Sequence, residues 1–192
     1  MRVAILGGTF DPVHNGHVRL AEEVRDRLGY DRVLLVPAAQ SPHKEMRPAA
    51  GAADRLAMVR LATLGREGLS ASDFEVNRGG QSFTIVTVES VARELTPDGR
   101  PGLVIGADLA DLFPSWKDAE QIATLADLIV VSRPGYAGDL PWDHESLDGE
   151  VMTESSSEIR RRIARGDYWE DLVPESVARY ILDHQLYSRP AG

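Results

Sequence analysis

The sequence predicts an α/β fold, a doubly wound parallel sheet with helices on both faces. Short apolar runs of strand length alternate with longer segments whose apolar residues recur every three or four positions. Residues 2–36 contain a strand, a helix and a second strand, a βαβ unit whose strands must run parallel. The length of 192 residues, with 43% hydrophobic and 27% charged residues, is that of a globular chain, and we expect one domain over residues 1–192.

The expected elements follow from the apolar pattern and its glycine and proline breaks. A strand at 2–6 stops at a glycine pair, a helix at about 16–28 ends at Gly29, and a strand at 32–36 is closed by Pro37. Further helices are predicted at 53–66, 82–95, 118–125, 156–165 and 174–184. Further strands are predicted at 74–76, 103–105, 128–131 and 150–152, and residues 135–149 read as a loop.

Charge and composition exclude several classes of protein. The 21 basic and 30 acidic residues give a net charge of −9, which disfavours a nucleic-acid-coating role. The absence of cysteine excludes disulfides, thiolate metal sites and a cysteine nucleophile. No apolar run approaches the ~18 residues of a membrane helix, and the apolar start is too short for a signal peptide. We therefore expect a soluble cytoplasmic protein without a membrane partner, and its oligomeric state, a homo-oligomer included, stays open.

The turn between the first strand and the first helix carries the strongest functional signal. Gly7 and Gly8 let a bulky anion approach backbone N–H groups at the edge where open α/β sheets bind ligands. His14 and His17 lie one turn apart at the helix start, where the helix dipole favours phosphate oxygens. Gly16, between them, has no side chain to block that approach.

Each of these features also has a simpler interpretation. A glycine pair after a strand is often only a turn, and His-x-x-His could be half of a zinc site that needs further ligands. Neither a Walker phosphate loop nor the dinucleotide Gly-x-Gly-x-x-Gly pattern is present in this turn.

The segment Gly8-Thr-Phe-Asp-Pro-Val-His-Asn-Gly-His17 resembles the signature of the nucleotidyltransferase superfamily. The resemblance implies a Rossmann-like fold and transfer of a nucleotidyl group from a nucleoside triphosphate to a phosphate acceptor, with release of pyrophosphate. It also implies catalytic roles for the two histidines and ATP contacts from Gly8, Thr9, Phe10 and Gly16.

A second segment, Thr153-Glu-Ser-Ser-Ser-Glu-Ile-Arg160, precedes a predicted helix. Ser155 and Glu158 have capping-box spacing, so taken alone the segment reads as a well-capped helix. It is also similar to the superfamily's Ser-Ser-Thr-x-Ile-Arg segment, which implies that Ser155, Ser156 and Ser157 bind the triphosphate and that Arg160 is catalytic. Glu154 stands where an aliphatic residue is usual.

Further segments resemble one branch, the bacterial nicotinate-nucleotide adenylyltransferases, along nearly the whole chain. They are residues 36–44, 54–58, 81–87, 106–108, 114–117, 132–135 and 173–187. Two departures are Phe83 in place of tyrosine and Val86 in place of aspartate. The resemblance implies condensation of nicotinate mononucleotide with ATP to deamido-NAD and pyrophosphate, with Mg²⁺ entering on ATP and no protein metal site.

This branch also implies further binding residues. ATP contacts are expected from Gly106, Asp108 and Arg133, and acceptor contacts from His43, Lys44, Ser82, Thr84, Ile85 and Trp116. From the residues alone, Trp116 could instead be core, Asp108 a helix cap, and the 43–44 pair solvent-exposed. The remaining alternatives are another acceptor, such as nicotinamide mononucleotide or phosphopantetheine, and a non-catalytic nucleotide-binding regulator.

Overall fold

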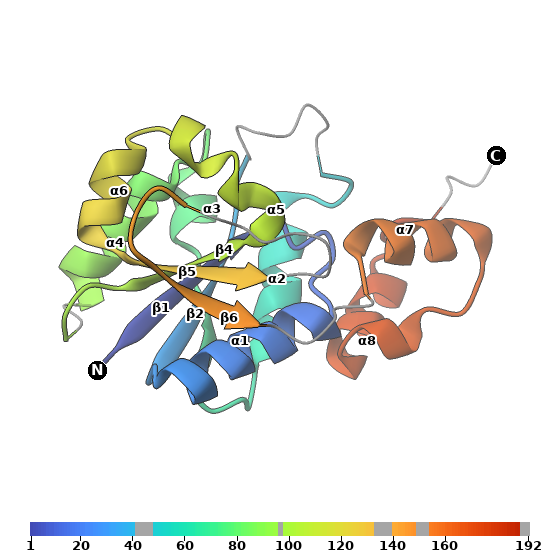
Figure 1. Cartoon of the computed structure of the whole chain (residues 1–192). Helices are drawn as coiled ribbons and strands as arrows, with labels where there is room; N and C mark the ends of the chain where they lie inside the picture. The colour runs from blue at the N-terminus through green and yellow to red at the C-terminus, as the bar shows by residue number, and fades with distance from the viewer. Residues whose placement is uncertain (41–47, 96–97, 133–139, 149–153, 189–192) are drawn as a thin grey trace.

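The computed structural model describes residues 1–40, 48–95, 98–132, 140–148 and 154–188. Its centre is a six-stranded sheet in the order β3-β2-β1-β4-β5-β6, in which every neighbouring pair is parallel (Figure 1). The strands are β1 (Val3–Gly8), β2 (Arg32–Pro37), β3 (Leu69–Ala71), β4 (Gly102–Gly106), β5 (Asp127–Ser132) and β6 (His144–Asp148). The prediction of a doubly wound parallel sheet is confirmed.

Helices cover both faces of this sheet. They are α1 (Asn15–Leu28), α2 (Ala52–Thr63), α3 (Phe74–Arg78), α4 (Thr84–Leu95), α5 (Ala107–Ala110), α6 (Ala119–Leu125), α7 (Ser156–Arg165) and α8 (Glu175–Asp183). The described residues also contain two 3₁₀ turns, η1 (Phe113–Ser115) and η2 (Glu170–Leu172). Among the described residues, no helix has the length and apolarity to cross a membrane.

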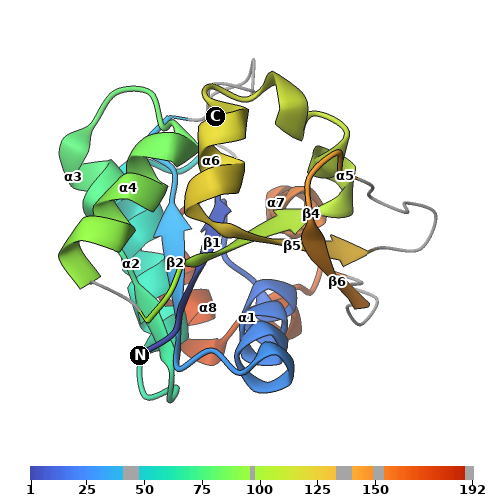
Figure 2. The ribbon, with the colours of Figure 1, turned by 60° about the vertical axis from the view of Figure 1, so that its left-hand side comes forward.

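The central strand β1 shows why two cores form. Successive side chains of a strand point to opposite faces, so Ala4 and Leu6 join one core while Val3 and Ile5 join the other. The first core packs against α1, α2, α7 and α8, and the second against α4, α5 and α6. Figure 2 shows α4 and α6 on one side of the sheet and α1 and α8 on the other.

Two of the predicted elements are wrong. Residues 74–76 belong to helix α3, and the strand lies earlier, at Leu69–Ala71. The buried Glu75 explains the difference, because its carboxylate accepts a hydrogen bond from the Thr87 hydroxyl at 2.5 Å and so turns a helical face toward α4. The loop predicted at 135–149 contains the edge strand β6, whose five residues bury only Leu147. The strand predicted at 150–152 lies outside the described residues.

Candidate active site

The predicted phosphate site lies at the carboxyl end of β1, between β2 and β4. The chain leaves β1 toward β2 and later crosses to β4 on the other side, so the strand order reverses here. Parallel sheets bind ligands in the crevice that such a reversal opens. In Figure 1 the arrowheads of β5 and β6 point toward α7, which lies at this end of the sheet.

The turn after β1 is closely packed around Phe10. A Cβ on Gly8 would lie 2.8 Å from the Phe10 ring, so only glycine fits there without a shift of the ring. Phe10 is buried and has a positive φ of 51°, a strained conformation of the kind that concentrates at functional sites. Its ring edge meets the His17 ring with centroids 4.9 Å apart, which fixes one side of that imidazole.

His14 and His17 lie together at the start of α1. Their ring centroids are 3.7 Å apart at an interplanar angle of 31°. The His14 backbone N–H donates to Nδ1 of His17 at 3.2 Å, so in the neutral ring the proton is on Nε2. A ring with an Nε2–H donor at a helix N-terminus is suited to phosphate oxygens. Gly16, which is buried, follows as the second residue of the helix.

The second predicted segment joins this turn. Ser156 Oγ donates to the Pro12 carbonyl at 2.9 Å, and Arg160 Nη1 donates to the Asp11 carbonyl at 2.6 Å. Arg160 Nη2 also donates to Ser157 Oγ at 3.3 Å. The N-terminus of α7 therefore lies beside the turn that leads into α1.

Ser155 is the N-cap of α7. Its hydroxyl accepts a hydrogen bond from the Glu158 N–H at 3.2 Å, as the capping-box spacing predicted. The unusual Glu154 has a partner in α1, because Arg19 Nη2 contacts both of its carboxylate oxygens at 2.7 Å. Burial is the largest single influence and raises the pKa of Glu154, but the hydrogen bond from Arg19, a backbone hydrogen bond and the charge of Arg19 together lower the pKa overall. The Glu154 charge, which the sequence alone does not explain, thus ties the segment before α7 to α1.

Asp11 connects the turn to two distant parts of the chain. Its carboxylate is 5% exposed and accepts hydrogen bonds from the N–H groups of Ala49 and Ala50 at 2.8 and 3.0 Å. The Tyr187 hydroxyl donates to the same carboxylate at 2.9 Å, and Arg160 forms an ion pair with it at 3.7 Å. Sequence reasoning gave Asp11 no role beyond its place in the motif.

Arg55, on α2, is the largest fully buried side chain. Its guanidinium donates to the carbonyls of Thr9 and Ala38 at 2.7 Å each, of Ala39 at 3.1 Å and of Ala50 at 3.3 Å. Burial lowers the pKa of Arg55, and the nearby Asp11 charge opposes this. The residue holds the turn after β1 against the segment after β2.

The predicted acceptor side begins at Ser82. Its hydroxyl accepts a hydrogen bond from the Ala39 N–H, and its N–H donates to the Gln40 carbonyl, each at 2.9 Å. Thr84 and Ile85 lie in the first turn of α4, where backbone N–H groups lack acceptors within the helix. The Ile85 side chain itself lies in the core, so only its backbone can face a ligand.

The loop that carries Trp116 adjoins the start of α4. The Lys117 ammonium lies 4.7 Å above the centre of the Phe83 ring. Trp116 is half-buried and packs against Phe113 with ring centroids 5.2 Å apart. Trp116 and Phe83 both pack against the second core at the start of α4.

Asp108 lies exposed in the first turn of α5, directly after β4. A Cβ on Gly106 would lie 2.6 Å from Asp108 Oδ1, so glycine lets this carboxylate fold back over the strand end. His43, Lys44 and Arg133 lie outside the described residues.

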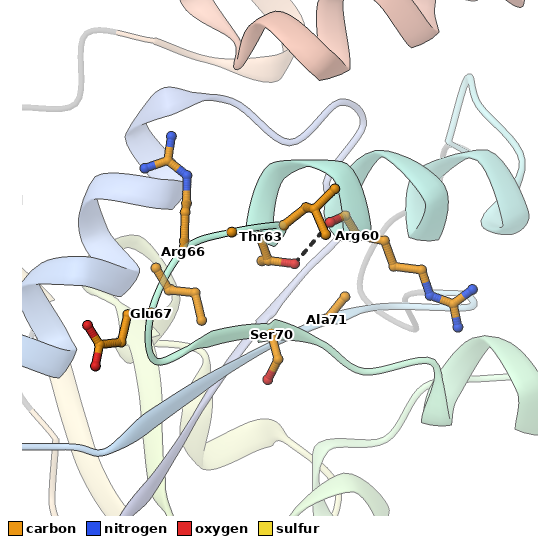
Figure 3. A pocket seen from close by; sticks show the side chains of 9 residues that line it. Arg60, Thr63, Arg66, Glu67, Ser70 and Ala71 are labelled. Carbon is orange, nitrogen blue, oxygen red and sulfur yellow. Dashed lines mark hydrogen bonds between the residues drawn. The ribbon is translucent and has the colours of Figure 1, made fainter.

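A surface pocket of about 590 Å³ lies away from all of these groups. It surrounds the turn between α2 and β3, at the amino end of β3, and Figure 3 shows Arg60 and Arg66 extending outward on its two sides. Both arginines are paired, with Asp73 and Glu22 respectively, at 2.7 Å. The predicted site is at the opposite, carboxyl edge of the sheet.

The comparison with known proteins decides the family. Residues 5–162 match the cytidylyltransferase-like family. A probable nicotinate-nucleotide adenylyltransferase of Synechococcus sp. (strain JA-2-3B'a(2-13)) is 39% identical over 199 residues, covering 98% of each chain. One from Roseiflexus sp. (strain RS-1) is 41% identical over 198 residues, covering 96% of this chain and 97% of the relative. The chain belongs to the nicotinate-nucleotide adenylyltransferase family.

Membership of this family makes the chain a nucleotidyltransferase of NAD biosynthesis. The solved structure of Plasmodium falciparum nicotinic acid mononucleotide adenylyltransferase complexed with NaAD has the same fold, with a TM-score of 0.76 at 18% identity over 97% of each chain. The structure of the same enzyme complexed with APC gives a TM-score of 0.74 at 17% identity, over 97% of this chain and 96% of that one.

Sequence reasoning missed three residues that hold the phosphate turn in place. Arg55 and Tyr187 were seen only as parts of matching segments, and Asp11 only as part of a motif. An arginine inside an otherwise apolar helical face is a signal that could have identified Arg55, because a guanidinium is rarely buried without partners.

Proposed function

We propose that this chain transfers the adenylyl group of ATP to nicotinate mononucleotide at the carboxyl end of β1, forming deamido-NAD and pyrophosphate. The observation that carries the proposal is the joining of two helix N-termini, through the Arg160–Asp11 and Ser156–Pro12 contacts of 2.6 and 2.9 Å. Two such termini provide aligned N–H groups and positive dipole ends for a triphosphate. The whole chain, residues 1–192, works as one nucleotidyltransferase domain.

The reaction is a direct in-line displacement at the α-phosphorus of ATP. The acceptor phosphate is an anion at neutral pH and attacks without a general base, so the site contributes positioning and charge neutralisation. In this proposal His14 and His17 both contact the phosphates and neutralise charge that moves to pyrophosphate, His17 through its Nε2–H. Arg160 and the serines at 155–157 hold the β and γ phosphates, and Gly8, Thr9, Phe10 and Gly16 shape the turn around them.

Magnesium enters as part of the MgATP substrate in this proposal. No cluster of three or more His, Asp or Glu side chains that could hold a metal ion occurs in the described parts of the chain. The chemistry of the donors at the turn also suits anions, since it consists of imidazoles, hydroxyls, a guanidinium and backbone N–H groups.

In this proposal, backbone N–H groups at the start of α4 make the site prefer nicotinate over nicotinamide. A carboxylate accepts hydrogen bonds from the N–H groups of Thr84 and Ile85, whereas a carboxamide turns its own donors toward at least one of them. A mismatched buried donor costs about 1–3 kcal/mol, roughly tenfold to a hundredfold in specificity. Trp116 stacks on either pyridine ring and does not discriminate between them.

An acceptor panel tests the proposal. Nicotinate mononucleotide, nicotinamide mononucleotide and phosphopantetheine are each assayed with ATP, with pyrophosphate release as the readout. We expect kcat/KM to favour nicotinate mononucleotide over the amide by at least about tenfold, and Trp116→Ala to weaken both pyridine acceptors by similar factors. Equal efficiency, or preference for either other acceptor, contradicts the proposal.

A further inference from the structure

Tyr187 lies 176 positions from Asp11 along the chain, yet its hydroxyl donates to Asp11 Oδ1 at 2.9 Å. It follows α8 in a short turn, which the Leu186 N–H closes by donating to the Ile181 carbonyl at 3.0 Å. Asp11 in turn forms part of the turn that lies between the two helix N-termini. The far end of the described chain therefore contacts the phosphate turn directly.

The backbone that delivers this hydroxyl is strained. Gln185 and Tyr187 have φ values of 52° and 64°, in the left-handed region that side chains other than glycine rarely adopt. Two such residues within three positions are unfavourable unless the surroundings enforce them. Side-chain packing contributes, because Leu186 and Tyr187 both pack against the first core.

The hydroxyl stays a donor throughout the neutral pH range. Burial raises the pKa of the Tyr187 phenol, and the charge of Asp11 and the hydrogen bond to it raise that pKa further. Asp11 Oδ1 thus receives two permanent donors, Tyr187 and the Ala50 N–H.

Asp11, held by these donors, makes two contacts with Arg160. Its carbonyl accepts a hydrogen bond from Arg160 Nη1 at 2.6 Å, and its carboxylate forms an ion pair with the same nitrogen at 3.7 Å. The Arg160 side chain is 31% exposed, and the contacts with Asp11, together with the hydrogen bond to Ser157 Oγ at 3.3 Å, fix the direction of its guanidinium. A displacement of Asp11 moves the acceptor atom on which the guanidinium rests.

We propose that Tyr187 is a positioning residue that acts through Asp11 to aim Arg160 at the triphosphate. Tyr187 touches no substrate in this arrangement. The inference rests on the proposed function, because it takes Arg160 to be an ATP-binding group.

The chain offers a matched control for this inference. Tyr180, on α8, also donates its hydroxyl to an aspartate, Asp54 Oδ1, at 3.0 Å. Asp54 lies in the first turn of α2 and not in the phosphate turn. Tyr180→Phe and Tyr187→Phe therefore each remove one Tyr–Asp hydrogen bond between the last helical segment and the rest of the molecule.

The experiment measures the Kd of MgATP by titration calorimetry without acceptor, and kcat and KM with it, in the full chain. We expect Tyr187→Phe to raise the Kd and the KM of ATP at least about fivefold, and Tyr180→Phe to change both by less than about twofold. Loss of folded protein alone lowers the apparent kcat and the number of binding sites but leaves Kd unchanged. Tyr187→4-aminophenylalanine, which restores a donor, is expected to recover most of the affinity.

A double-mutant cycle separates this inference from the proposed function. We expect Arg160→Ala to raise the Kd of MgATP at least about tenfold. When Tyr187→Phe is added to Arg160→Ala, we expect the Kd to rise by less than a further factor of about two. If Arg160→Ala weakens ATP binding but Tyr187→Phe does not, the inference fails and the proposed function stands. If Arg160→Ala leaves the Kd unchanged, the ATP-binding role of Arg160 fails, and the inference with it.

Two further outcomes also overturn the inference. One is equal weakening by Tyr187→Phe and Tyr180→Phe, which indicates general loosening of α8. The other is a full effect of Tyr187→Phe in the Arg160→Ala background, which shows that it does not act through Arg160. If Tyr187→Phe melts at a low temperature, all binding is measured well below its melting point, with the 4-aminophenylalanine variant as the folded reference.

Discussion

The protonation pattern of His17 is decided by a backbone group. Because the His14 N–H occupies Nδ1, the neutral ring can hold its proton only on Nε2 and is kept from rotating by the Phe10 edge. The ring needs no carboxylate partner to select this tautomer. A donor fixed in advance costs little reorganisation when phosphate charge develops.

Replacement of His17 by alanine tests this donor. We expect His17→Ala to lower turnover by about a hundredfold or more, as for a lost oxyanion donor, with little change in stability because the side chain is only half-buried. The measurement is steady-state pyrophosphate release together with thermal melting. His184→Ala, on the exposed end of α8, serves as the control. Near-normal turnover in His17→Ala, with Arg160→Ala inactive, would show that the start of α1 is not the reacting centre.

Removal of the buried guanidinium tests Arg55. Arg55→Met leaves the carbonyls of Thr9, Ala38, Ala39 and Ala50 without that donor, and each unpaired buried group costs about 1–3 kcal/mol. We expect Arg55→Met to lower the free energy of unfolding, measured in urea, by at least about 3 kcal/mol. Arg60→Met, on the same helix with a 58% exposed side chain, is expected to lose less than about 1 kcal/mol. Similar losses in the two variants would refute the bridging role.

At the scale of elements, the contact between α7 and α1 includes an ion pair that responds to pH. The pKa of Glu154 is lowered in the folded chain, so the stability that this pair contributes is present above the ordinary glutamate pKa of 4.5. It is lost as pH falls through the lowered folded value. Arg19 is 41% exposed, so we expect a contribution of only about 1 kcal/mol or less.

Glu154→Gln measures that contribution. We expect the variant to melt slightly below the parent chain at pH 7, and the difference to shrink as the pH is lowered below 4.5. Glu175→Gln, whose ion pair with Arg179 is fully on the surface, is the control and is expected to show almost no difference at either pH. A difference for Glu154→Gln that grows on acidification would contradict the assigned sign.

The predicted elements succeeded where apolar periodicity is strong and failed where it is weak. Helix α1 follows from Val18, Ala21 and Val24, all buried, and from the terminating Gly29, whose φ is +68°. Strand β6 has one buried residue in five and no apolar run to reveal it. The alternation of Phe74 and Val76 with Glu75 predicts a strand where α3 lies, because Thr87, the buried partner of Glu75, is visible only in the fold.

At the scale of the whole molecule, a chain of net charge −9 must bind a polyphosphate in a local region of positive potential. In the proposed reaction, magnesium on the substrate would offset part of the polyphosphate charge. We expect EDTA to abolish activity and excess Mg²⁺ to restore it, while metal analysis of the purified protein finds much less than one zinc or magnesium per chain. One tightly bound zinc per chain would revive the His-x-x-His metal interpretation.

How much of the site the sequence predicts depends on chain distance. His14 and His17 share one helical turn, so their proximity follows from spacing alone. The approach of Arg160 was expected only from the resemblance to the superfamily, because no periodicity relates residues 149 positions apart. Three supporting residues come from three separate parts of the chain: Asp11 follows β1, Arg55 is on α2 and Tyr187 follows α8. Only the folded sheet brings them together.

The Asp11–Tyr187 contact also has a consequence for synthesis on the ribosome. The chain is made from its amino end, so the phosphate turn is translated 176 positions before its tyrosine partner. A nascent chain already contains both histidines and all six strands before Tyr187 is added. A polypeptide that ends after residue 148 but before residue 187 therefore contains all six strands of the sheet and still lacks the Tyr187 donor to Asp11. A stop codon in that interval leaves the phosphate turn without this hydrogen bond.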